Sequence, residues 1–259
     1  MQHIGAIAKT LVDHSEERGE HCETHGAYTS KKYMGRIWSK CPVCSADDAK
    51  RRADRVAAEQ ADSERKRIER MLGAAGIPER FASRKLGSFD AQLAEQRYAL
   101  AFAERFADEF AGKHSGRCAV FSGMPGTGKT HLACGIALRI MHKYSRTAVF
   151  TTVSKMARRI REAKSFSADE TESSVISAYV MPHLLIVDEV GMQSGTDAEA
   201  RSLFDVVNER YESCKPTLFL TNLDINGVRE AIGERLFDRM REDGGEIVAF
   251  TWNSYRGAA

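Results

Sequence analysis

The stretch that decides the fold runs from Cys118 to Tyr144 and reads CAVFSGMPGTGKTHLACGIALRIMHKY. An apolar run, Cys118 to Ser122, is followed by the motif G-x4-G-K-T at positions 123 to 130 and then by a mostly apolar, helix-forming segment. A strand, a glycine-rich turn and a helix in this order are the setting in which this motif cradles phosphate groups. The sequence therefore predicts a phosphate-binding loop.

The residue types in this loop suit ATP with Mg2+. Glycines let backbone N–H groups turn toward the β-phosphate at a helix N-terminus. Lys129 is expected to reach the β and γ oxygens, and Thr130 to offer its hydroxyl to Mg2+. The expected nucleotide-binding residues of this stretch are Gly123, Pro125, Gly126, Thr127, Gly128, Lys129, Thr130 and His131.

Two more apolar runs end in polar side chains. The first, PHLLIVDEVG, ends in Asp188, which would hold Mg2+ directly or through water, and Glu189, which would polarise a water for attack on the γ-phosphate. A carboxylate beside the metal ligand favours hydrolysis over transfer to a small acceptor. The second, PTLFLTNLD, places Asn222 at a strand end, where we expect it to hydrogen-bond the attacking water.

Strands and helices alternate through this part of the chain. AVFTTVSKMARRIRE predicts a strand followed by a helix, and AEARSLFDVVNERYES predicts a helix. The alternation indicates an α/β fold of three layers with a parallel sheet. Ahead of the phosphate loop, the segment from Gln92 to Phe110 is amphipathic, and its predicted buried face consists of Leu93, Tyr98, Leu100, Phe102, Phe106 and Phe110.

Near the beginning of the chain, four side chains have the spacing of a zinc site. Cys22-x2-His25 and Cys41-x2-Cys44 are separated by fifteen residues. Each two-residue spacer lets a tight turn direct both side chains at one tetrahedral ion. We interpret this as a zinc ribbon with a structural and docking role, and not as a catalytic zinc site. His21 is an alternative to His25, and a surface histidine beside unligated cysteines is the alternative to zinc.

The composition changes after this cluster and predicts three parts: a zinc-ribbon module at 1–45, a charged helical linker at 46–75 and the main domain at 76–259. The linker is rich in Ala, Glu, Arg and Lys, so it forms a helix but offers almost no stripe to bury. A solvated connecting helix is the first interpretation. A helix that docks a partner is the second, and its support is Val56, Ile68, Met71 and Leu72.

Charge and hydropathy limit the possible partners. The net charge of +2 gives no strong overall field for nucleic acid, so any nucleic-acid surface must be a local patch. There is no signal-peptide pattern and no run of about 18 to 20 apolar residues that could span a membrane. We expect a cytoplasmic protein without a membrane partner.

Five segments, in order, are GMPGTGKT, LLIVDEVG, LFLTNLD, IGERLFDRMRE and WNSYR. Together they resemble the DnaC-type helicase loaders of bacteria and their phages, AAA+ ATPases similar to the initiator DnaA and to the IstB transposition helpers. The resemblance covers Gly76 to Gly257 and implies a homo-oligomeric AAA+ ATPase that binds single-stranded DNA and a replicative helicase of the DnaB type. The zinc ribbon replaces the helical N-terminal domain of those loaders, so no helicase-docking residue is carried over.

The resemblance also implies roles for three arginines. Arg239, in the triplet DRM, matches the arginine finger that reaches the ATP of a neighbouring subunit, and Arg235, one turn earlier, is a second candidate. Arg256, in SYR, matches the sensor arginine that contacts the nucleotide of its own subunit. The alternative is a helix made soluble by pairs of Asp238 with Arg235 and Arg241, which would contribute only tenths of a kcal/mol.

The segment SKMARRIREAKSFSADETESSVISAYV resembles the helical insert that lines a channel for single-stranded DNA in the initiator and loader subgroup. Basic side chains there can neutralise phosphates and an aromatic ring can stack on a base. The candidate DNA residues are Arg158, Arg161, Lys164 and Phe166. A solvated basic helix face balanced by Asp169, Glu170 and Glu172 is the alternative.

The function that follows is ATP-dependent loading of the replicative helicase onto single-stranded DNA, with ATP binding and hydrolysis controlling assembly and release. An IstB-like ATPase that remodels DNA for a transposase is the main alternative. A monomeric phosphotransferase and a zinc-ribbon binding protein with a structural nucleotide are two others. The second of these is disfavoured by Glu189, because a structural nucleotide needs no catalytic base.

Overall fold

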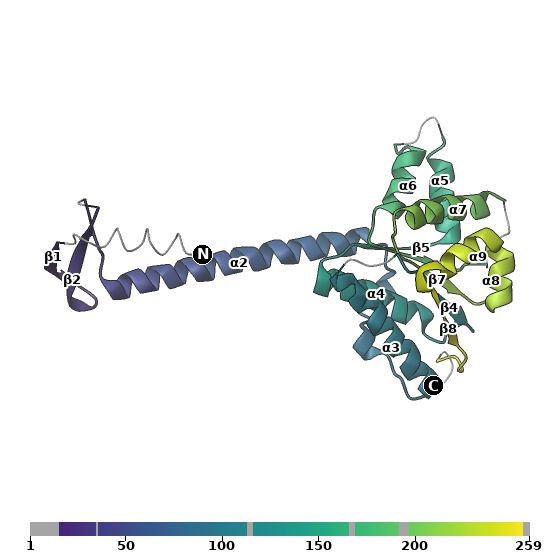
Figure 1. The fold of residues 1–259 in the computed structure, drawn as a ribbon, viewed down its shortest axis with the longest axis horizontal. Helices are drawn as coiled ribbons and strands as arrows, with labels where there is room; N and C mark the ends of the chain where they lie inside the picture. Colours follow the sequence, from purple (N-terminus) through teal and green to yellow (C-terminus); the bar gives the residue numbers. More distant parts are fainter. Residues whose placement is uncertain (1–15, 35, 113–115, 166–168, 192–196, 256–259) are drawn as a thin grey trace. The chain divides into compact units, whose positions relative to one another are not determined.

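The structure is a computed structural model that describes residues 16–34, 36–112, 116–165, 169–191 and 197–255. Two of the candidate residues, Phe166 and Arg256, lie outside the described residues. The chain divides into two compact units, one ending at Lys66 and the other beginning at Arg67. Figure 1 shows the fold of each unit.

The N-terminal unit contains a three-stranded antiparallel sheet. Its strands are β1 (Glu17–Cys22), β2 (Gly26–Tyr33) and β3 (Ile37–Trp38), in the order β1-β2-β3. The long helix α2 (Pro42–Ala74) follows, and proline suits its first position because the missing N–H has no intrahelical partner there.

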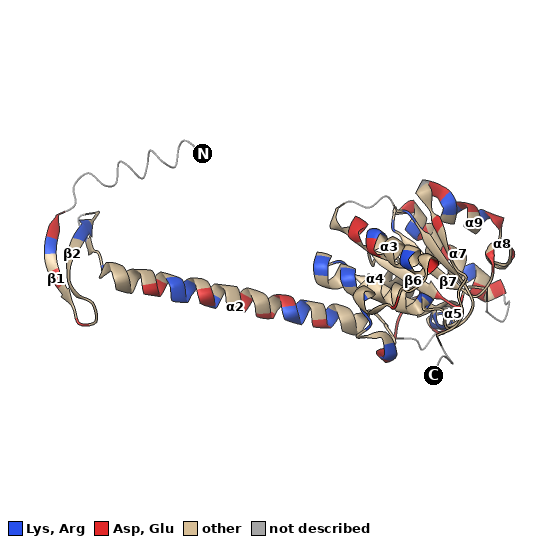
Figure 2. Ribbon diagram, turned by 90° about the horizontal axis from the view of Figure 1, so that it is seen from below, with Lys and Arg blue, Asp and Glu red and all other residues tan. Residues whose placement is uncertain are grey.

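No residue of α2 is buried, and Figure 2 shows basic and acidic residues alternating along it. The absence of buried residues in α2 is consistent with the solvated connecting helix that the composition of this segment predicts. Met71 and Leu72, in the last turn of α2, belong to the second unit and are partly buried against its core.

The second unit is built on a five-stranded sheet. The strands are β4 (Ala119–Gly123), β5 (Ala148–Thr152), β6 (Leu184–Asp188), β7 (Thr217–Thr221) and β8 (Glu246–Phe250). Their order is β5-β6-β7-β4-β8, and every neighbouring pair is parallel. The predicted α/β fold with a parallel sheet is confirmed.

Helices cover both faces of this sheet, so the domain has three layers. One hydrophobic cluster lies beneath α3 (Ala94–Asp108) and α4 (Lys129–Tyr144). A second cluster lies beneath α5 (Val153–Glu162), α6 (Glu172–Val180), α7 (Asp197–Glu212) and α9 (Glu234–Arg241). The remaining α-helix of the described residues is α8 (Ile225–Ile232), and short 3-10 turns are η1 (Glu79–Phe81), η2 (Leu86–Ser88), η3 (Glu109–Ala111) and η4 (Glu242–Gly244).

The predicted buried face of α3 is partly wrong. Phe102, Phe106 and Phe110 are buried, as expected, but Leu93 and Tyr98 are about half exposed. The helix begins at Ala94, so Leu93 lies outside it. The buried stripe of α3 follows positions three and four apart, and Tyr98 falls off that stripe. Its hydroxyl donates instead to Glu246.

Parallel strands place their carboxyl ends at one edge of the sheet, which is where ligands bind in open α/β sheets. The loop after β4, the acidic end of β6 and the end of β7 therefore meet there. Among the described residues, no helix is long and apolar enough to cross a membrane.

Candidate functional site

The predicted phosphate loop connects β4 to α4 at this edge of the sheet. Gly128, at the N-cap of α4, has left-handed backbone with φ 96°. A Cβ atom there would lie 2.6 Å from Cε2 of Phe89. Both backbone conformation and space therefore require glycine. The loop runs directly into a helix N-terminus, whose unpaired N–H groups favour an anion.

Lys129 is the first residue of α4, directly after the loop, and is 7% exposed. Its ammonium group donates to the carbonyl oxygens of Gly123, at 2.6 Å, and Met124, at 2.9 Å. It also donates to Oδ1 of Asn222, at 2.9 Å. Two candidate residues separated by 93 positions in the sequence are therefore in direct contact.

The end of β6 places a carboxylate beside the loop hydroxyl. Thr130 donates from Oγ1 to Oδ2 of Asp188 at 3.2 Å, and the N–H of Glu189 donates to Oδ1 of Asp188 at 2.7 Å. Burial raises the pKa of Asp188, and the hydrogen bond from the Glu189 N–H opposes that rise. A hydroxyl and a carboxylate side by side are hard oxygen ligands that fit Mg2+.

Glu189 follows with a strained backbone. Its φ is 61°, in the left-handed region that non-glycine residues rarely adopt. Such a conformation costs on the order of 1 to 3 kcal/mol and is found most often at functional sites. The side chain of Glu189 is exposed and lines the same cavity as Lys129 and Asp188.

A cavity of about 530 Å³ collects these side chains. Its lining includes these candidate residues: Pro125, Gly126, Gly128, Lys129, Thr130, His131, Asp188, Glu189 and Asn222. Gly123 and Thr127 do not line the cavity, but their contacts constrain the conformation of the loop. A Cβ atom at Gly123 would lie 2.2 Å from the carbonyl oxygen of Phe250, and the buried Thr127 donates from Oγ1 to the carbonyl of Met124 at 2.8 Å.

His131 is held at the wall of the cavity. Its Nε2 lies 3.1 Å from the carbonyl oxygen of Lys85 and 3.2 Å from Oγ of Ser88. Burial lowers the pKa of His131. The ring therefore favours the neutral form, which can donate or accept a hydrogen bond but adds no charge for a phosphate.

The remaining wall consists of residues that sequence reasoning missed: Arg80, Phe81, Arg84, Ser88, Phe89, Asp90 and Tyr255. The edge of Phe89 meets His131 at a ring separation of 5.5 Å and Tyr255 at 6.0 Å. Aromatic and cationic side chains suit the base and phosphates of a nucleotide. Tyr255 lies in the segment WNSYR, but no role was predicted for it. No motif marks the others, which come from residues 80–90, far from the phosphate loop in the sequence.

The last described segment joins this wall to the loop. The indole N–H of Trp252 donates to the carbonyl of Thr127 at 3.0 Å, and the backbone N–H of Tyr255 donates to the carbonyl of Gly126 at 3.0 Å. The hydroxyl of Tyr255 donates to the carbonyl of Asp90 at 2.7 Å. The segment WNSY thus contacts both the phosphate loop and Asp90 in the remaining wall of the cavity.

The two candidate finger arginines lie on α9 and are not among the residues lining the cavity of their own chain. Arg239 is half-buried, donates to the side-chain oxygen of Asn208, and lies 5.1 Å over the ring of Tyr211 and 5.5 Å over that of Phe204. Arg235 is exposed. Within the described residues, neither pair of Asp238 with Arg235 or Arg241 forms an ion pair, so the solubilising pairs considered for this helix are not observed.

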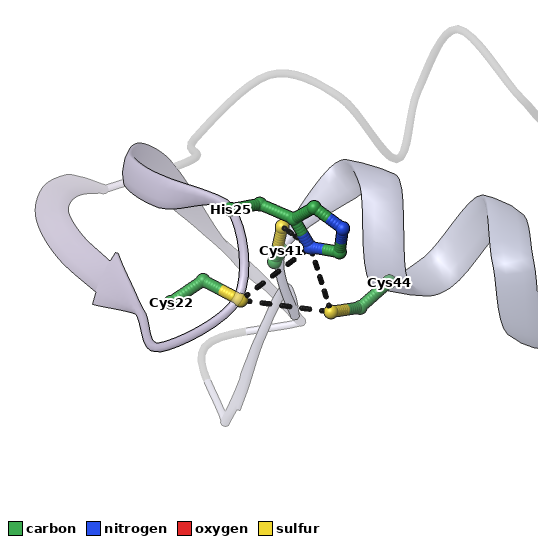
Figure 3. A group of neighbouring side chains, drawn as sticks. All are labelled: Cys22, His25, Cys41 and Cys44. Carbon is green, nitrogen blue, oxygen red and sulfur yellow. Dashed lines mark hydrogen bonds between the residues drawn. The ribbon is translucent and has the colours of Figure 1, made fainter.

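The four predicted zinc ligands of the N-terminal unit converge (Figure 3). Cys22, His25, Cys41 and Cys44 offer ligand atoms that all lie within 4.8 Å of one another. Cys22 Sγ lies 3.6 Å from Cys44 Sγ, and His25 Nδ1 lies 3.7, 3.7 and 3.3 Å from the three sulfurs. Ligand atoms around one tetrahedral zinc ion lie roughly 3.5 to 3.8 Å apart, so three of these four separations match and the distance from His25 to Cys44 is slightly shorter.

The chemistry of this cluster also fits a cation. Backbone hydrogen bonds from Thr24 and His25 lower the pKa of Cys22 to about 6, while Cys22 raises the pKa of Cys44. Crowded thiols of this kind are stabilised by a metal that takes them as thiolates. His21, the alternative ligand, lies in β1 opposite Ala27 and does not belong to the group.

The candidate DNA residues of α5 differ in their surroundings. Arg158 and Arg161 are exposed. Lys164, just after the helix, forms an ion pair with Glu172 at 2.8 Å, and Arg159 forms one with Glu170 at 2.6 Å. The charge balance considered as the alternative is therefore present for two of the basic residues. Arg158 and Arg161 form no ion pair in the part of the chain that the structure describes.

The arrangement can bind a nucleoside triphosphate and position a water. Lys129 and the loop before α4 line the cavity, Thr130 and Asp188 offer oxygen atoms that suit a metal ion, and Glu189 and Asn222 line the same cavity. These are the parts that phosphoryl transfer to water requires.

Comparisons with known proteins agree with this fold. The chain is 32% identical over 191 residues to a protein named replicative helicase loader DnaC from Buchnera aphidicola subsp. Schizaphis graminum, which covers 73% of this chain and 76% of that protein. The crystal structure of the DnaC helicase loader aligns with a TM-score of 0.60 at 20% identity, over 66% of this chain and 99% of that chain. Replication initiator DnaA bound to AMPPCP and single-stranded DNA aligns with a TM-score of 0.57 at 19% identity, over 68% and 51%.

These likenesses confirm the AAA+ fold and the resemblance to the DnaC-type loaders inferred from the sequence segments. The family model described as IstB-like ATP binding protein matches residues 49–257, which is most of the chain. This protein therefore belongs to the family of IstB-like ATP binding proteins.

Proposed function

We propose that this protein is an ATPase that loads a replicative helicase onto single-stranded DNA, with ATP binding and hydrolysis controlling its assembly and the release of the helicase. The observation that carries the proposal is the cavity in which Lys129, Asp188, Glu189 and Asn222 meet. The likeness to a named helicase loader across 73% of the chain supports the choice of partner.

Five residues of the cavity have proposed roles in hydrolysis. Lys129 binds the β and γ oxygens, and Asn222 hydrogen-bonds the attacking water. Glu189 accepts the proton of that water as it attacks. Thr130 and Asp188 would hold Mg2+, which would neutralise negative charge on the phosphates when bound.

A complete site requires a second subunit in this proposal. Arg239 would reach the γ-phosphate bound to a neighbouring protomer, with Arg235 as its support, and Arg256 would contact the nucleotide of its own subunit. The exposure of Arg235 and the place of Arg239 beside α7, outside the cavity of its own chain, are consistent with a role in trans. Homo-oligomerisation would then make hydrolysis dependent on assembly.

Single-stranded DNA is the proposed nucleic-acid partner. Arg158 and Arg161 on α5 would contact phosphates, and Lys164 would join them by exchanging its ion pair with Glu172 for a phosphate. Phe166 would stack on a base. The similarity of the fold to a DnaA chain solved with single-stranded DNA adds support to the choice of this partner.

Zinc is the proposed ion of the N-terminal unit, held by Cys22, His25, Cys41 and Cys44. Its role would be structural, because it fixes the short sheet to the first turn of α2, where Cys44 lies. We propose the three-part organisation of a zinc ribbon at 1–45, a helical linker at 46–75 and an AAA+ domain at 76–259, and the ribbon as the part that docks a partner.

The test is capture of the replicative helicase from the same cell by full-length protein in ATP. Glu189→Gln should retain the helicase, while wild type should release it as ATP is hydrolysed. A second candidate, an IstB-like helper of a transposase, has the family match in its favour. Recovery of a transposase and no helicase with either protein would replace the loader proposal by this second one.

A further inference from the structure

The segment after β8 binds the phosphate loop through two consecutive carbonyl groups. Trp252, buried at 6% exposure, donates from its indole N–H to the carbonyl of Thr127 at 3.0 Å. The backbone N–H of Tyr255 donates to the carbonyl of Gly126, also at 3.0 Å. Both donors come from one short stretch of chain. Two neighbouring peptide units of the loop are therefore held on the same side.

The geometry of the peptide bond gives these contacts a consequence for ligand binding. In a trans peptide, the carbonyl of one residue and the N–H of the next lie in one plane and point in opposite directions. The described residues contain no cis peptide bond. Because the carbonyls of Gly126 and Thr127 point to the C-terminal segment, the N–H groups of Thr127 and Gly128 point away from it. Gly126 and Gly128 both line the cavity.

The C-terminal segment is itself anchored at both ends. The ring of Trp252 packs on Phe250 at a centroid separation of 4.7 Å, directly after β8, which pairs with β4. At the other end, the hydroxyl of Tyr255 donates to the carbonyl of Asp90 at 2.7 Å. A support fixed at two points can hold the loop in one conformation before a ligand arrives. Preorganised donors of this kind lose less entropy on binding.

We propose that Trp252 and Tyr255 are positioning residues for the diphosphate part of the nucleotide. They hold the loop carbonyls so that the N–H groups of Thr127 and Gly128 face the α- and β-phosphates. The inference rests on the proposed nucleotide-binding function and adds how the phosphate loop is preorganised. Neither residue transfers a proton or touches the reacting atoms.

The first test replaces Trp252 by Phe, which removes the indole N–H and keeps a ring beside Phe250. Titration calorimetry with ADP should show binding weaker by about three- to ten-fold, the usual effect of one hydrogen bond. In ATP hydrolysis, KM should rise by a similar factor while kcat stays within about two-fold, because contacts to the α- and β-phosphates are lost equally in the ground and transition states. A variant that is merely less well folded would lose kcat and keep KM.

The second test addresses the backbone donor and uses a residue outside every helix and strand. Tyr255→Pro and Tyr255→Ala both lose the ring and the hydroxyl, but Tyr255→Pro also loses the N–H that binds Gly126. Tyr255→Pro should bind ADP about three- to ten-fold more weakly than Tyr255→Ala.

The outcomes separate this inference from the proposed function. Wild-type protein that binds ADP but hydrolyses no ATP would end the ATPase proposal, while the ADP titrations would still decide the role of Trp252 and Tyr255. Equal ADP affinity of wild type and Trp252→Phe, or of the two Tyr255 variants, overturns the inference. Wild-type protein that binds no ADP overturns both.

Discussion

The ammonium group of Lys129 donates to the side-chain oxygen of Asn222 at 2.9 Å, which connects the phosphate loop to the end of β7. Because the amide oxygen of Asn222 accepts this hydrogen bond, its NH2 group remains available as a donor. A donor at this position can fix a water or a phosphate oxygen.

The first prediction follows from this contact. Asn222→Ala should lower kcat on the order of 100-fold, because it removes a preorganised donor, while the affinity for ATP changes little. Steady-state hydrolysis with DNA present measures both. Asn226→Ala, on the exposed surface of α8, is the matched control and should hydrolyse ATP as wild type does. Hydrolysis by Asn222→Ala at the control rate would remove Asn222 from the site.

The second prediction concerns the base. Glu189→Gln keeps the size of the side chain and removes the charge that accepts a proton, so kcat should fall by about 10²- to 10⁴-fold. ATP binding should persist, because Lys129 and the loop are unchanged. Filter binding with labelled ATP measures whether binding persists, and a hydrolysis assay measures the fall in kcat. Glu230→Gln, exposed on α8, controls for the loss of one surface charge, and a wild-type rate in Glu189→Gln would assign the base elsewhere.

The third prediction tests the arginine in trans. Arg239→Ala keeps an intact cavity but lacks the finger, whereas Lys129→Ala cannot bind ATP but still carries Arg239. Each protein alone should be inactive, and a mixture should regain part of the wild-type rate. At some mixed interfaces the Arg239→Ala subunit supplies an intact ATP site and the Lys129→Ala subunit supplies Arg239. A mixture as inactive as its components would contradict the proposal.

A matched variant separates the finger role from packing on α7. Asn208→Ala removes the side-chain acceptor of Arg239 and leaves the guanidinium in place. It should cost about 1 kcal/mol of stability, measured by urea unfolding, and retain ATP hydrolysis. Loss of hydrolysis in Asn208→Ala would mean that hydrolysis depends on the packing of Arg239 against α7 of its own subunit. It would contradict a role of Arg239 that consists only of contact with the ATP of a neighbouring subunit.

The sequence predicted the parallel sheet and the strand ends that form the site. Each of these strands is visible in the sequence as an apolar run that ends in a polar residue or a glycine-rich motif. The motif at Lys129, the acidic end at Asp188 and the polar end at Asn222 each follow directly from an apolar run. Parallel strands place those ends at one edge, so their meeting was a consequence of topology. The structure adds the contact distances.

The rest of the cavity could not be predicted, since it depends on contacts between distant segments. Phe89 and Tyr255 are 166 positions apart in the numbering and meet ring to ring at 6.0 Å. Leu93 and Tyr98 were expected to be buried because they are apolar and near the period of a helix, yet the start of α3 and its angular position expose them. The local sequence pattern shows neither which distant segments meet nor where a helix begins and which of its sides is exposed.

The fourth prediction concerns zinc. Purified full-length protein should contain one zinc ion per chain by metal analysis, and Cys41→Ser should lose it, because three protein ligands hold a structural ion poorly. Cys214→Ser, which changes an exposed cysteine outside the cluster, is the control and should keep the ion. Full zinc content in Cys41→Ser would contradict the proposed ligand set.

The fifth prediction comes from Arg210, which no motif distinguishes from Arg201, the other arginine of α7. It is 0% exposed and donates to the carbonyls of Tyr179, Val180, Pro182, His183 and Pro216 and to the hydroxyl of Thr217. The guanidinium thereby joins the end of α6 to the beginnings of β6 and β7. These strands carry Asp188 and Asn222 at their other ends.

Arg210→Met preserves the aliphatic part of the side chain and leaves buried carbonyl groups without donors, each costing about 1 to 3 kcal/mol. The free energy of unfolding in urea should fall by at least about 3 kcal/mol. Arg201→Met, at an exposed position of the same helix, should change it by no more than about 0.5 kcal/mol. Equal losses in the two variants would mean that Arg210 does not hold the strands. Arg210→Lys should not restore stability, because an ammonium lacks the planar fork that reaches several carbonyls at once.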